Sequence, residues 1–180
     1  DLLEFPTVKP PAKQASKDFD VVYAQATEAQ AILTSAVATE WEELPTPLHP
    51  DTGKRFMRRA VKGKTTKPWI EVVDDPGVKG ATRARKKVDN DYGGDASQLK
   101  DLARLTLRFT RPKAMAQALR EFEALGFRIV VLKNKYRFVT PLGYSDFNLV
   151  VAATLEDGTD YLCEVQLNLV QMPEAKHLAH

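Results

Sequence analysis

The segment from Leu102 to Lys133 changes its hydrophobic period twice, and this limits the folds that the chain can adopt. Residues 102–109, LARLTLRF, alternate as a strand with one buried face does. Residues 112–125, PKAMAQALREFEAL, have the spacing of an amphipathic helix, with proline at the start and Gly126 just after the end. Residues 127–133, FRIVVLK, predict another strand. A strand, a helix and a strand in succession favour a sheet with a helix packed on it.

The remaining elements continue this mixture of periods. Apolar residues at helical spacing predict a long helix over 19–44, which Pro45 ends. The hairpin turn EDGTD, at 156–160, joins two further strands. We therefore expect an α+β (mixed α/β) fold with a single mixed sheet of about five strands flanked by helices. The other predicted elements are a loop at 45–53, a short basic helix at 54–63, a strand at 69–75, a short helix at 81–90, strands at 145–155 and 161–169, and a final helix at 170–180.

Domain organisation is simple. Residues 1–17 are rich in proline and lysine and lack periodicity, so we interpret them as a linker or arm. The 163 residues from 18 to 180 suffice for a single domain with its own core. Because the chain begins with Asp rather than Met, we expect an excised domain or a processed product.

Charge is unevenly distributed although the net charge is only +2. Seven Lys or Arg and no acid lie between Lys54 and Lys67, and five more basic residues lie between Lys79 and Lys87. Such patches indicate an anionic small ligand or nucleic acid, and a solvated basic face is the alternative. A single cysteine excludes a disulfide framework and a cysteine-based metal site. No apolar run is long enough to span a bilayer, so we expect no membrane partner.

The strand DYLCEVQLNL, residues 160–169, carries an unexpected carboxylate. Alternation places Tyr161, Cys163, Val165 and Leu167 toward a core, which predicts a buried, unreactive Cys163 thiol, and leaves Leu162, Glu164, Gln166 and Asn168 on the other face. Asp101 opens the strand at 102–109. Two carboxylates on adjacent strands can hold Mg²⁺, and nearby cations can bind phosphates. Acids at strand starts are also common as ordinary solvated groups.

Several motifs resemble the synthetase domain of RelA/SpoT-type alarmone enzymes. That family has an Asp-Leu-x-Gly-x-Arg strand, a lysine ahead of a Gly-Tyr pair, and a Glu-Val-Gln strand followed by a methionine. An upstream segment with two spaced lysines also matches. The resemblance covers about residues 69–180. The matching positions are Lys79, Lys87, Asp101, Lys133, Gly143, Tyr144, Glu164, Gln166 and Met172.

The resemblance implies a nucleotidyltransferase-like synthetase fold and an ATP-dependent pyrophosphokinase. Such enzymes transfer the β,γ-pyrophosphate of ATP to the 3′-hydroxyl of a purine nucleotide. Asp101 and Glu164 would bind Mg²⁺, with Glu164 also the candidate base. The remaining implied roles are ATP phosphate binding by Lys79, Arg83 and Lys87, stacking on the acceptor base by Tyr144, and further acceptor contacts by Lys133, Asn148 and Gln166.

The chain departs from the family pattern at several positions. Arg104 stands at the glycine of the Asp strand and Thr106 at its arginine. Two roles are open for Arg104, namely contact with phosphate and exposure to solvent. Asn148 replaces a histidine near the acceptor base, which puts guanine as the acceptor in doubt.

A divergent, stand-alone synthetase domain resembles the toxin branch of the family. We therefore favour adenine nucleotides as acceptors, giving (p)ppApp and ATP depletion. We expect a secreted antibacterial effector that acts in the cytoplasm of the target cell and has a cognate immunity protein. Three alternatives stay open: a (p)ppGpp synthetase using GDP or GTP, a toxin that pyrophosphorylates the 3′ end of tRNA, and a non-catalytic module that binds RNA or nucleotides. A protein without a toxin role would be cytoplasmic.

Overall fold

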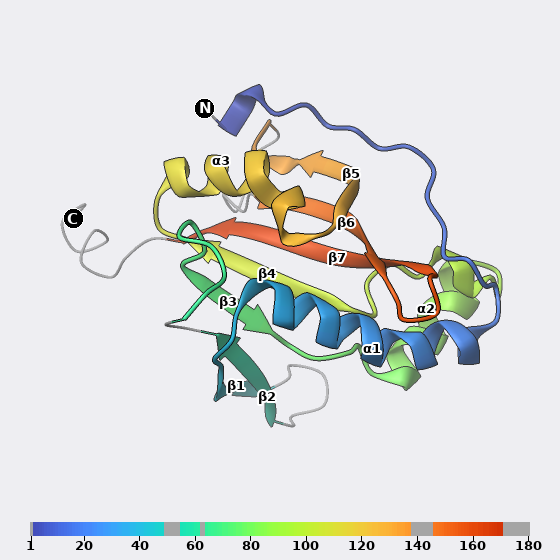
Figure 1. Cartoon of the computed structure of the whole chain (residues 1–180). Helices are drawn as coiled ribbons and strands as arrows, with labels where there is room; N and C mark the ends of the chain where they lie inside the picture. The colour runs from blue at the N-terminus through green and yellow to red at the C-terminus, as the bar shows by residue number, and fades with distance from the viewer. Residues whose placement is uncertain (1, 49–54, 62–63, 138–145, 171–180) are drawn as a thin grey trace.

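The computed structural model describes residues 2–48, 55–61, 64–137 and 146–170. Within these ranges the chain forms three α-helices, four short 3₁₀ helices and seven strands (Figure 1). The strands are β1 (Glu42–Leu48), β2 (Arg55–Val61), β3 (Val72–Asp75), β4 (Arg104–Phe109), β5 (Arg128–Asn134), β6 (Asp146–Thr154) and β7 (Asp160–Leu169). The helices are α1 (Phe19–Val37), α2 (Ala81–Asp91) and α3 (Pro112–Glu121), with 3₁₀ turns η1 (Leu2–Glu4), η2 (Ala96–Gln98), η3 (Phe122–Leu125) and η4 (Lys135–Arg137).

All the strands belong to one mixed sheet with the order β1-β2-β3-β4-β7-β6-β5. The pair β4 and β7 is parallel, and the other neighbouring pairs are antiparallel. The predicted α+β class with a single mixed sheet is confirmed. The predicted number of about five strands is wrong, because the sheet has seven.

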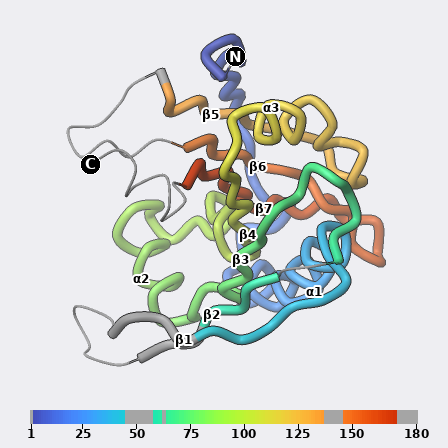
Figure 2. Tube along the Cα trace, turned by 90° about the vertical axis from the view of Figure 1, so that its left-hand side faces the viewer, coloured from blue at the N-terminus to red at the C-terminus, as the bar shows by residue number. Residues whose placement is uncertain are grey.

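Helices α1 and α3 cover one face of the sheet, whereas α2 lies on the other side (Figure 2). The covered face supplies the core: the inward side chains of β4 and β7 are almost fully buried, and the hydroxyl of Tyr161 donates to the carbonyl of Val22 on α1 at 2.7 Å. The predicted alternation of the last strand is confirmed, with Cys163 buried. The opposite face carries the polar side chains of β4 and β7 and is called the open face below.

Helix α1 ends seven residues earlier than predicted. Asp18 caps its start, because the carboxylate accepts from the backbone N–H groups of Asp20 and Val21. The helix stops at Val37, and Thr39 then donates its N–H to the carbonyl of Lys64. The following residues form β1, which also takes the first part of the predicted loop at 45–53. Pairing with β2 outweighs the helical spacing of residues 38–44.

The predicted short basic helix at 54–63 is wrong, since residues 55–61 are strand β2. The two consecutive arginines, Arg58 and Arg59, interrupt the alternation of apolar and polar residues that would have indicated a strand. Arg58 pairs with Asp74 at 3.4 Å, and Arg59 pairs with Asp75 at 2.7 Å. The two carboxylates are neighbours on β3 and point to opposite faces, so the two arginines do as well.

Most of the other predicted helices and strands are present in the structure. The strands of 69–75, 102–109, 127–133, 145–155 and 161–169 all exist with shifted ends, and the helix of 81–90 is α2. The helix of 112–125 is α3 followed by η3. Gly126 ends it with a positive φ of 101°, a backbone conformation that favours glycine. The final helix predicted at 170–180 lies almost wholly outside the described residues.

The N-terminal arm, residues 2–17, runs along the edge of the sheet beside β5 (Figure 1). Val8 exchanges two backbone hydrogen bonds of 2.8 Å with Leu132 on β5. Gln14 is buried, and its side chain bonds the carbonyl groups of Leu99 and Leu162 and the N–H of Leu162. The arm therefore packs on the domain at two places. Among the described residues, no helix has the length and apolar character needed to cross a membrane.

Candidate active site

The open face of β4 and β7 carries a ladder of polar side chains. The parallel register places Arg104 opposite Glu164, Thr106 opposite Gln166 and Arg108 opposite Asn168. All six side chains are partly exposed, whereas the residues between them are buried in the core. The alternation that buries one face therefore concentrates polar groups on the other.

The ladder continues across β6 and β5. Asn148 lies opposite Gln166, and Lys133 lies opposite Asn148. Thr106, Gln166, Asn148 and Lys133 thus form one row across four strands. Three residues predicted to bind the acceptor are brought together in this row. Tyr144, the fourth, lies outside the described residues.

Glu164 lies on the open face between Arg104 of β4 and Val150 of β6. Its backbone N–H donates to the carbonyl of Ala103 at 3.0 Å, which fixes the register of β7 on β4. Its Oε1 accepts a hydrogen bond of 3.1 Å from Nε2 of Gln166. The carboxylate is only partly buried and keeps oxygen capacity for a substrate or metal.

Asp101 stands just before β4 and binds two lysines through one oxygen. Its Oδ2 accepts from Nζ of Lys79 at 2.8 Å and from Nζ of Lys87 at 3.1 Å. Burial disfavours the charge of Asp101, but the two lysines outweigh it and hold the pKa of the carboxyl below its usual value. Burial likewise disfavours the charge of Lys87, yet Asp101 keeps its pKa above the usual value. These opposite shifts of Asp101 and Lys87 favour the charged form of both groups.

The predicted ATP phosphate residues come from α2 and the segment before it. Lys87 lies on α2, and the backbone N–H of Lys79 is held at 3.0 Å by the carbonyl of Leu102. Arg83 is exposed on α2, and its charge acts on Arg104. Three cations thus lie around one end of β4, beside Asp101.

The negative charges of Asp101 and Glu164 both act on the guanidinium of Arg104. Burial lowers the pKa of its guanidinium, while the charges of Asp101 and Glu164 oppose this effect. Its Nε donates to the carbonyl of Gly77 at 3.4 Å. The half-buried side chain is therefore part of the charged centre of the open face rather than a purely solvated residue.

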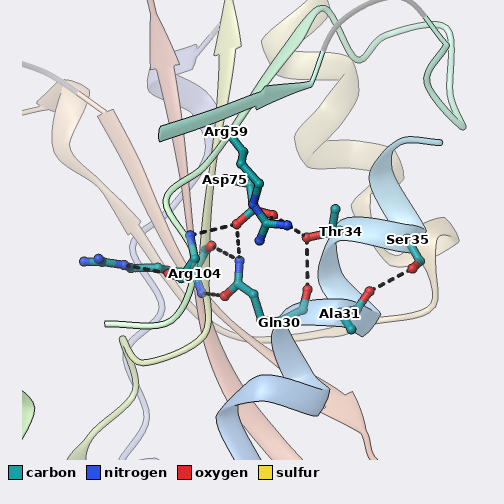
Figure 3. A network of polar contacts seen from close by, with 8 residues as sticks. Gln30, Ala31, Thr34, Ser35, Arg59, Asp75 and Arg104 are labelled. Atoms are coloured by element: carbon teal, nitrogen blue, oxygen red, sulfur yellow. Dashed lines mark hydrogen bonds and ion pairs between the residues drawn. The ribbon is translucent and has the colours of Figure 1, made fainter. Parts of the chain in front are cut away.

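A buried network fixes the backbone of Arg104 to α1 (Figure 3). The amide of Gln30 accepts from the N–H of Arg104 at 2.8 Å and donates to its carbonyl at 2.8 Å. The same amide donates to Asp75 at 2.7 Å. Asp75 also accepts from Thr34 and pairs with Arg59. The side chain of Gln30 thus makes the two hydrogen bonds to the backbone of Arg104 that a neighbouring strand would make, because the pairing of β3 with β4 ends before this residue.

Sequence reasoning missed a hollow of about 180 Å³ on the open face. It is lined by Arg58, Asp74, Pro76, Thr106, Arg108, Gln166 and Asn168. Asp74 lies between Arg58 and Arg108, at 3.4 and 3.7 Å. The alternation of Arg104, Thr106 and Arg108 was the signal that could have placed Arg108 here. Arg58 could not be placed while its segment was interpreted as a helix.

The two predicted metal ligands suit Mg²⁺ in donor type. Oδ1 of Asp101 is buried and has no hydrogen-bond partner, which is unusual for a carboxylate oxygen. Among the described residues, no group of three or more His, Cys, Asp or Glu side chains could hold a metal. Mg²⁺ is commonly bound by one or two carboxylates together with substrate phosphates, so a pair is enough.

Known proteins share both sequence and fold with the chain. No family model matches it. Over 99 residues it is 33% identical to the (p)ppApp synthetase toxin Tas1 of Pseudomonas aeruginosa (strain UCBPP-PA14). This match covers 55% of the chain but only 21% of Tas1, so the chain spans about a fifth of that relative.

Among solved structures, the small alarmone synthetase 1 from Bacillus subtilis, bound to its product pppGpp, aligns with a TM-score of 0.55. The alignment covers 90% of this chain and 76% of that one at 18% identity. The chain has the fold of a small alarmone synthetase. The resemblance to RelA/SpoT-type synthetase domains is thereby confirmed. A complex of the type VI effector Tas1 with its immunity protein also aligns, at 25% identity over 87% of this chain and 63% of that one, but its TM-score of 0.46 is too low for structural argument.

Proposed function

We propose that the protein is a pyrophosphokinase that transfers the β,γ-pyrophosphate of ATP to the 3′-hydroxyl of a purine nucleotide. One observation carries the proposal. On a synthetase-like sheet, Glu164 lies opposite Arg104, and Asp101, just before β4, binds two of the three cations predicted to hold phosphate. Phosphoryl-type transfer needs mainly positioning and charge neutralisation, and this arrangement offers both.

Glu164 is the proposed general base. The acceptor 3′-oxygen attacks the β-phosphorus of ATP and forms the new oxygen–phosphorus bond. The bond from the β-phosphorus to the oxygen that bridges it to the α-phosphorus breaks, and AMP leaves with that oxygen. Glu164 accepts the proton of the hydroxyl, which is a weak nucleophile until a base lies within hydrogen-bond reach.

The cations and Arg104 have separate tasks. Lys79, Arg83 and Lys87 hold the phosphates of ATP, and Arg104 stabilises negative charge next to Glu164. Asp101 and Glu164 would hold Mg²⁺, which would neutralise phosphate charge when bound. Binding of phosphates to Lys79 and Lys87 would release Asp101 from its present partners.

Adenine nucleotides are the proposed acceptors, giving (p)ppApp. The sequence similarity to a (p)ppApp synthetase toxin supports this choice. It is also supported by Asn148, which stands in place of the family's histidine and lies in one row with Gln166 and Lys133. Tyr144 is proposed to stack on the base, and Lys133, Asn148 and Gln166 to contact the remainder of the acceptor. GDP, GTP and the 3′ end of tRNA are the alternatives that an acceptor assay must include.

The same similarity supports a toxin role. We propose that the domain is delivered to a target cell, depletes ATP in its cytoplasm, and is neutralised in the producing cell by an immunity protein. Expression in a susceptible bacterium should lower the ATP pool and raise 3′-pyrophosphorylated adenosine. Arrest of growth without either change would contradict this role.

The decisive experiment combines the acceptor assay with Glu164→Gln. The wild-type protein, with ATP and Mg²⁺, should yield AMP and a 3′-pyrophosphorylated nucleotide, separated by chromatography. Glu164→Gln keeps the shape but removes the charge and the base, so turnover should fall at least about 100-fold. Glu156→Gln, at an exposed acid in the hairpin turn, is the matched control and should retain activity.

Two outcomes would contradict the proposal. A wild-type protein that forms no product from adenine nucleotides, guanine nucleotides or tRNA would not be a pyrophosphokinase. Salt-dependent RNA binding that is unchanged in Glu164→Gln would then favour the non-catalytic module. Full activity of Glu164→Gln would remove Glu164 from the role of base.

A further inference from the structure

The N-terminal arm brings lysines to the open face beside β5. Val8 pairs with Leu132 in the antiparallel sense, so Lys9 lies opposite Val131, which is two residues before Lys133 and on the same face of β5. On the other side of the arm, Nζ of Lys100 donates to the carbonyl of Ala12 at 3.1 Å. Three lysines that are far apart in sequence therefore converge, namely Lys9, Lys100 and Lys133, which we call the arm cluster.

The arm is held in place on both sides of Lys9 and Lys13. The Val8–Leu132 pair fixes one side, and buried Gln14 fixes the other through Leu99 and Leu162. Ala12 also packs on a small apolar group of the open face formed by Val131, Val150, Ala152 and Leu162. The cluster thus belongs to the folded domain.

The lysines of the arm cluster repel one another without a balancing carboxylate in contact. Burial and then the charges of Lys9, Lys135 and Lys100 lower the pKa of Lys133. Within the described ranges, no acid lies within ion-pair distance of Lys9, Lys100 or Lys133, whereas Lys13 reaches Asp95 at 3.9 Å. An anion bound here would relieve this repulsion.

The cluster adjoins the proposed base. Lys133 shares a row with Asn148 and Gln166, and the charge of Glu164 acts on it. Arg83 and the lysines bound to Asp101 lie around the start of β4, and Lys100, which directly precedes Asp101 and contacts Ala12, links them to the arm. Cations therefore follow the open face from the start of β4 to β5. A reaction between two phosphorylated substrates needs cations for the phosphates of both the donor and the acceptor.

We propose that Lys9 and Lys100, together with Lys133, bind the 5′-phosphates of the acceptor nucleotide and favour acceptors with two or three of them. The assignment of the anion as an acceptor rests on the proposed function. The anion site itself rests on the arm geometry alone. A 5′-monophosphate would engage fewer of the three ammonium groups than a di- or triphosphate.

An internal competition measures the preference. Equal AMP, ADP and ATP with Mg²⁺ give pApp, ppApp and pppApp, and their ratio reports relative acceptor efficiency. We expect ppApp and pppApp to exceed pApp. In Lys9→Met the ratio of ppApp to pApp should fall about fivefold, as expected for loss of one partly exposed charge contact. Lys9→Arg should restore it, and Lys113→Met on α3 should leave it unchanged. A merely structural defect would lower all products together, and an unchanged ratio in Lys9→Met would overturn the proposal.

A second measurement separates this inference from the proposed function. Calorimetric titration of the full chain with inorganic tripolyphosphate, without Mg²⁺, detects the anion site in the absence of chemistry. Lys9→Met and Lys100→Met should each weaken binding about fivefold relative to Lys113→Met. Equal binding in all three would overturn the anion site even if pyrophosphate transfer occurs. Weakened binding would uphold it even if no transfer is found. Arm-dependent binding of tRNA with no tripolyphosphate binding would overturn the acceptor assignment in favour of a nucleic-acid backbone.

Discussion

Asp101 uses a single oxygen to hold two lysines that are proposed to bind ATP phosphates. Its other oxygen is buried without a hydrogen-bond partner. The nucleotide phosphates must therefore compete with Asp101 for Lys79 and Lys87, and a cation at Asp101 would lower that competition. Metal and nucleotide should bind more tightly together than either does alone.

Replacement of Asp101 by Asn tests this competition. Without Mg²⁺, ATP should bind Asp101→Asn about fivefold more tightly than the wild type, because the rival charge is gone. The gain in affinity on adding Mg²⁺ should disappear in the variant. Calorimetric titration with and without EDTA measures both quantities. Asp89→Asn on α2 changes the net charge equally and serves as the control. Equal ATP affinity in the two variants would contradict the competition between Asp101 and the nucleotide phosphates for the two lysines.

At the scale of elements, α1 is tied to the active-site strand by Gln30. The side chain is 4% exposed and makes three hydrogen bonds, two to the backbone of Arg104 and one to Asp75. Replacing it with an apolar residue of similar size leaves these buried groups unpaired. Each such group costs about 1–3 kcal/mol.

We therefore expect Gln30→Leu to lower the free energy of unfolding by about 3 kcal/mol. Urea denaturation followed by circular dichroism measures the change. Gln117→Leu, on the exposed side of α3, should change stability by less than about 0.5 kcal/mol. Similar stability of both variants would show that the network contributes little and that water replaces the amide.

The elements that sequence could predict are those with a clear period. β4 alternates strictly, and β7 does so from Cys163 to Asn168, because each buries one face under α1 and α3. β1 and β2 were missed because their main stabilisation is pairing with one another and with β3. Arg58 and Arg59, identical in charge but on opposite faces, give no alternation for sequence reasoning to detect.

Sequence reasoning named the candidate site residues one by one but not the surface that they form. The family resemblance named Asp101, Lys133, Glu164 and Gln166, and the sheet brings Gln166 into a row with Lys133 through Asn148. The register that joins this row to Thr106 is a non-local property that one sequence does not display. The same holds for the arm, which was interpreted only as a linker or arm and whose contact with β5 depends on the fold.

At the scale of the whole molecule, the stability of the fold should depend on pH in two ways. A carboxylate paired with lysines loses its contribution at acidic pH, and the buried thiol and phenol groups lose theirs at alkaline pH. The pKa of Asp101 is below its ordinary value of 3.8, so its ionisation stabilises the folded state above about that pH. This contribution is lost as pH falls through the lower folded value. Burial raises the pKa of Cys163 from 9.0 to about 12, and burial also raises that of Tyr161. Those contributions are complete below the ordinary values and are lost as pH rises. Stability should therefore peak near neutral pH and fall on both sides.

The alkaline side can be assigned to one atom with Cys163→Ala. Above pH 9 the unfolded thiol ionises and the folded one does not, which removes up to about 1.4 kcal/mol of stability for each pH unit. The variant lacks this loss, although the missing sulfur lowers its stability at every pH. The difference in unfolding free energy between wild type and variant should therefore shrink from pH 8 to pH 10.5, as measured by urea denaturation. A constant difference would mean that the folded thiol ionises as readily as the unfolded one and would contradict its burial in β7.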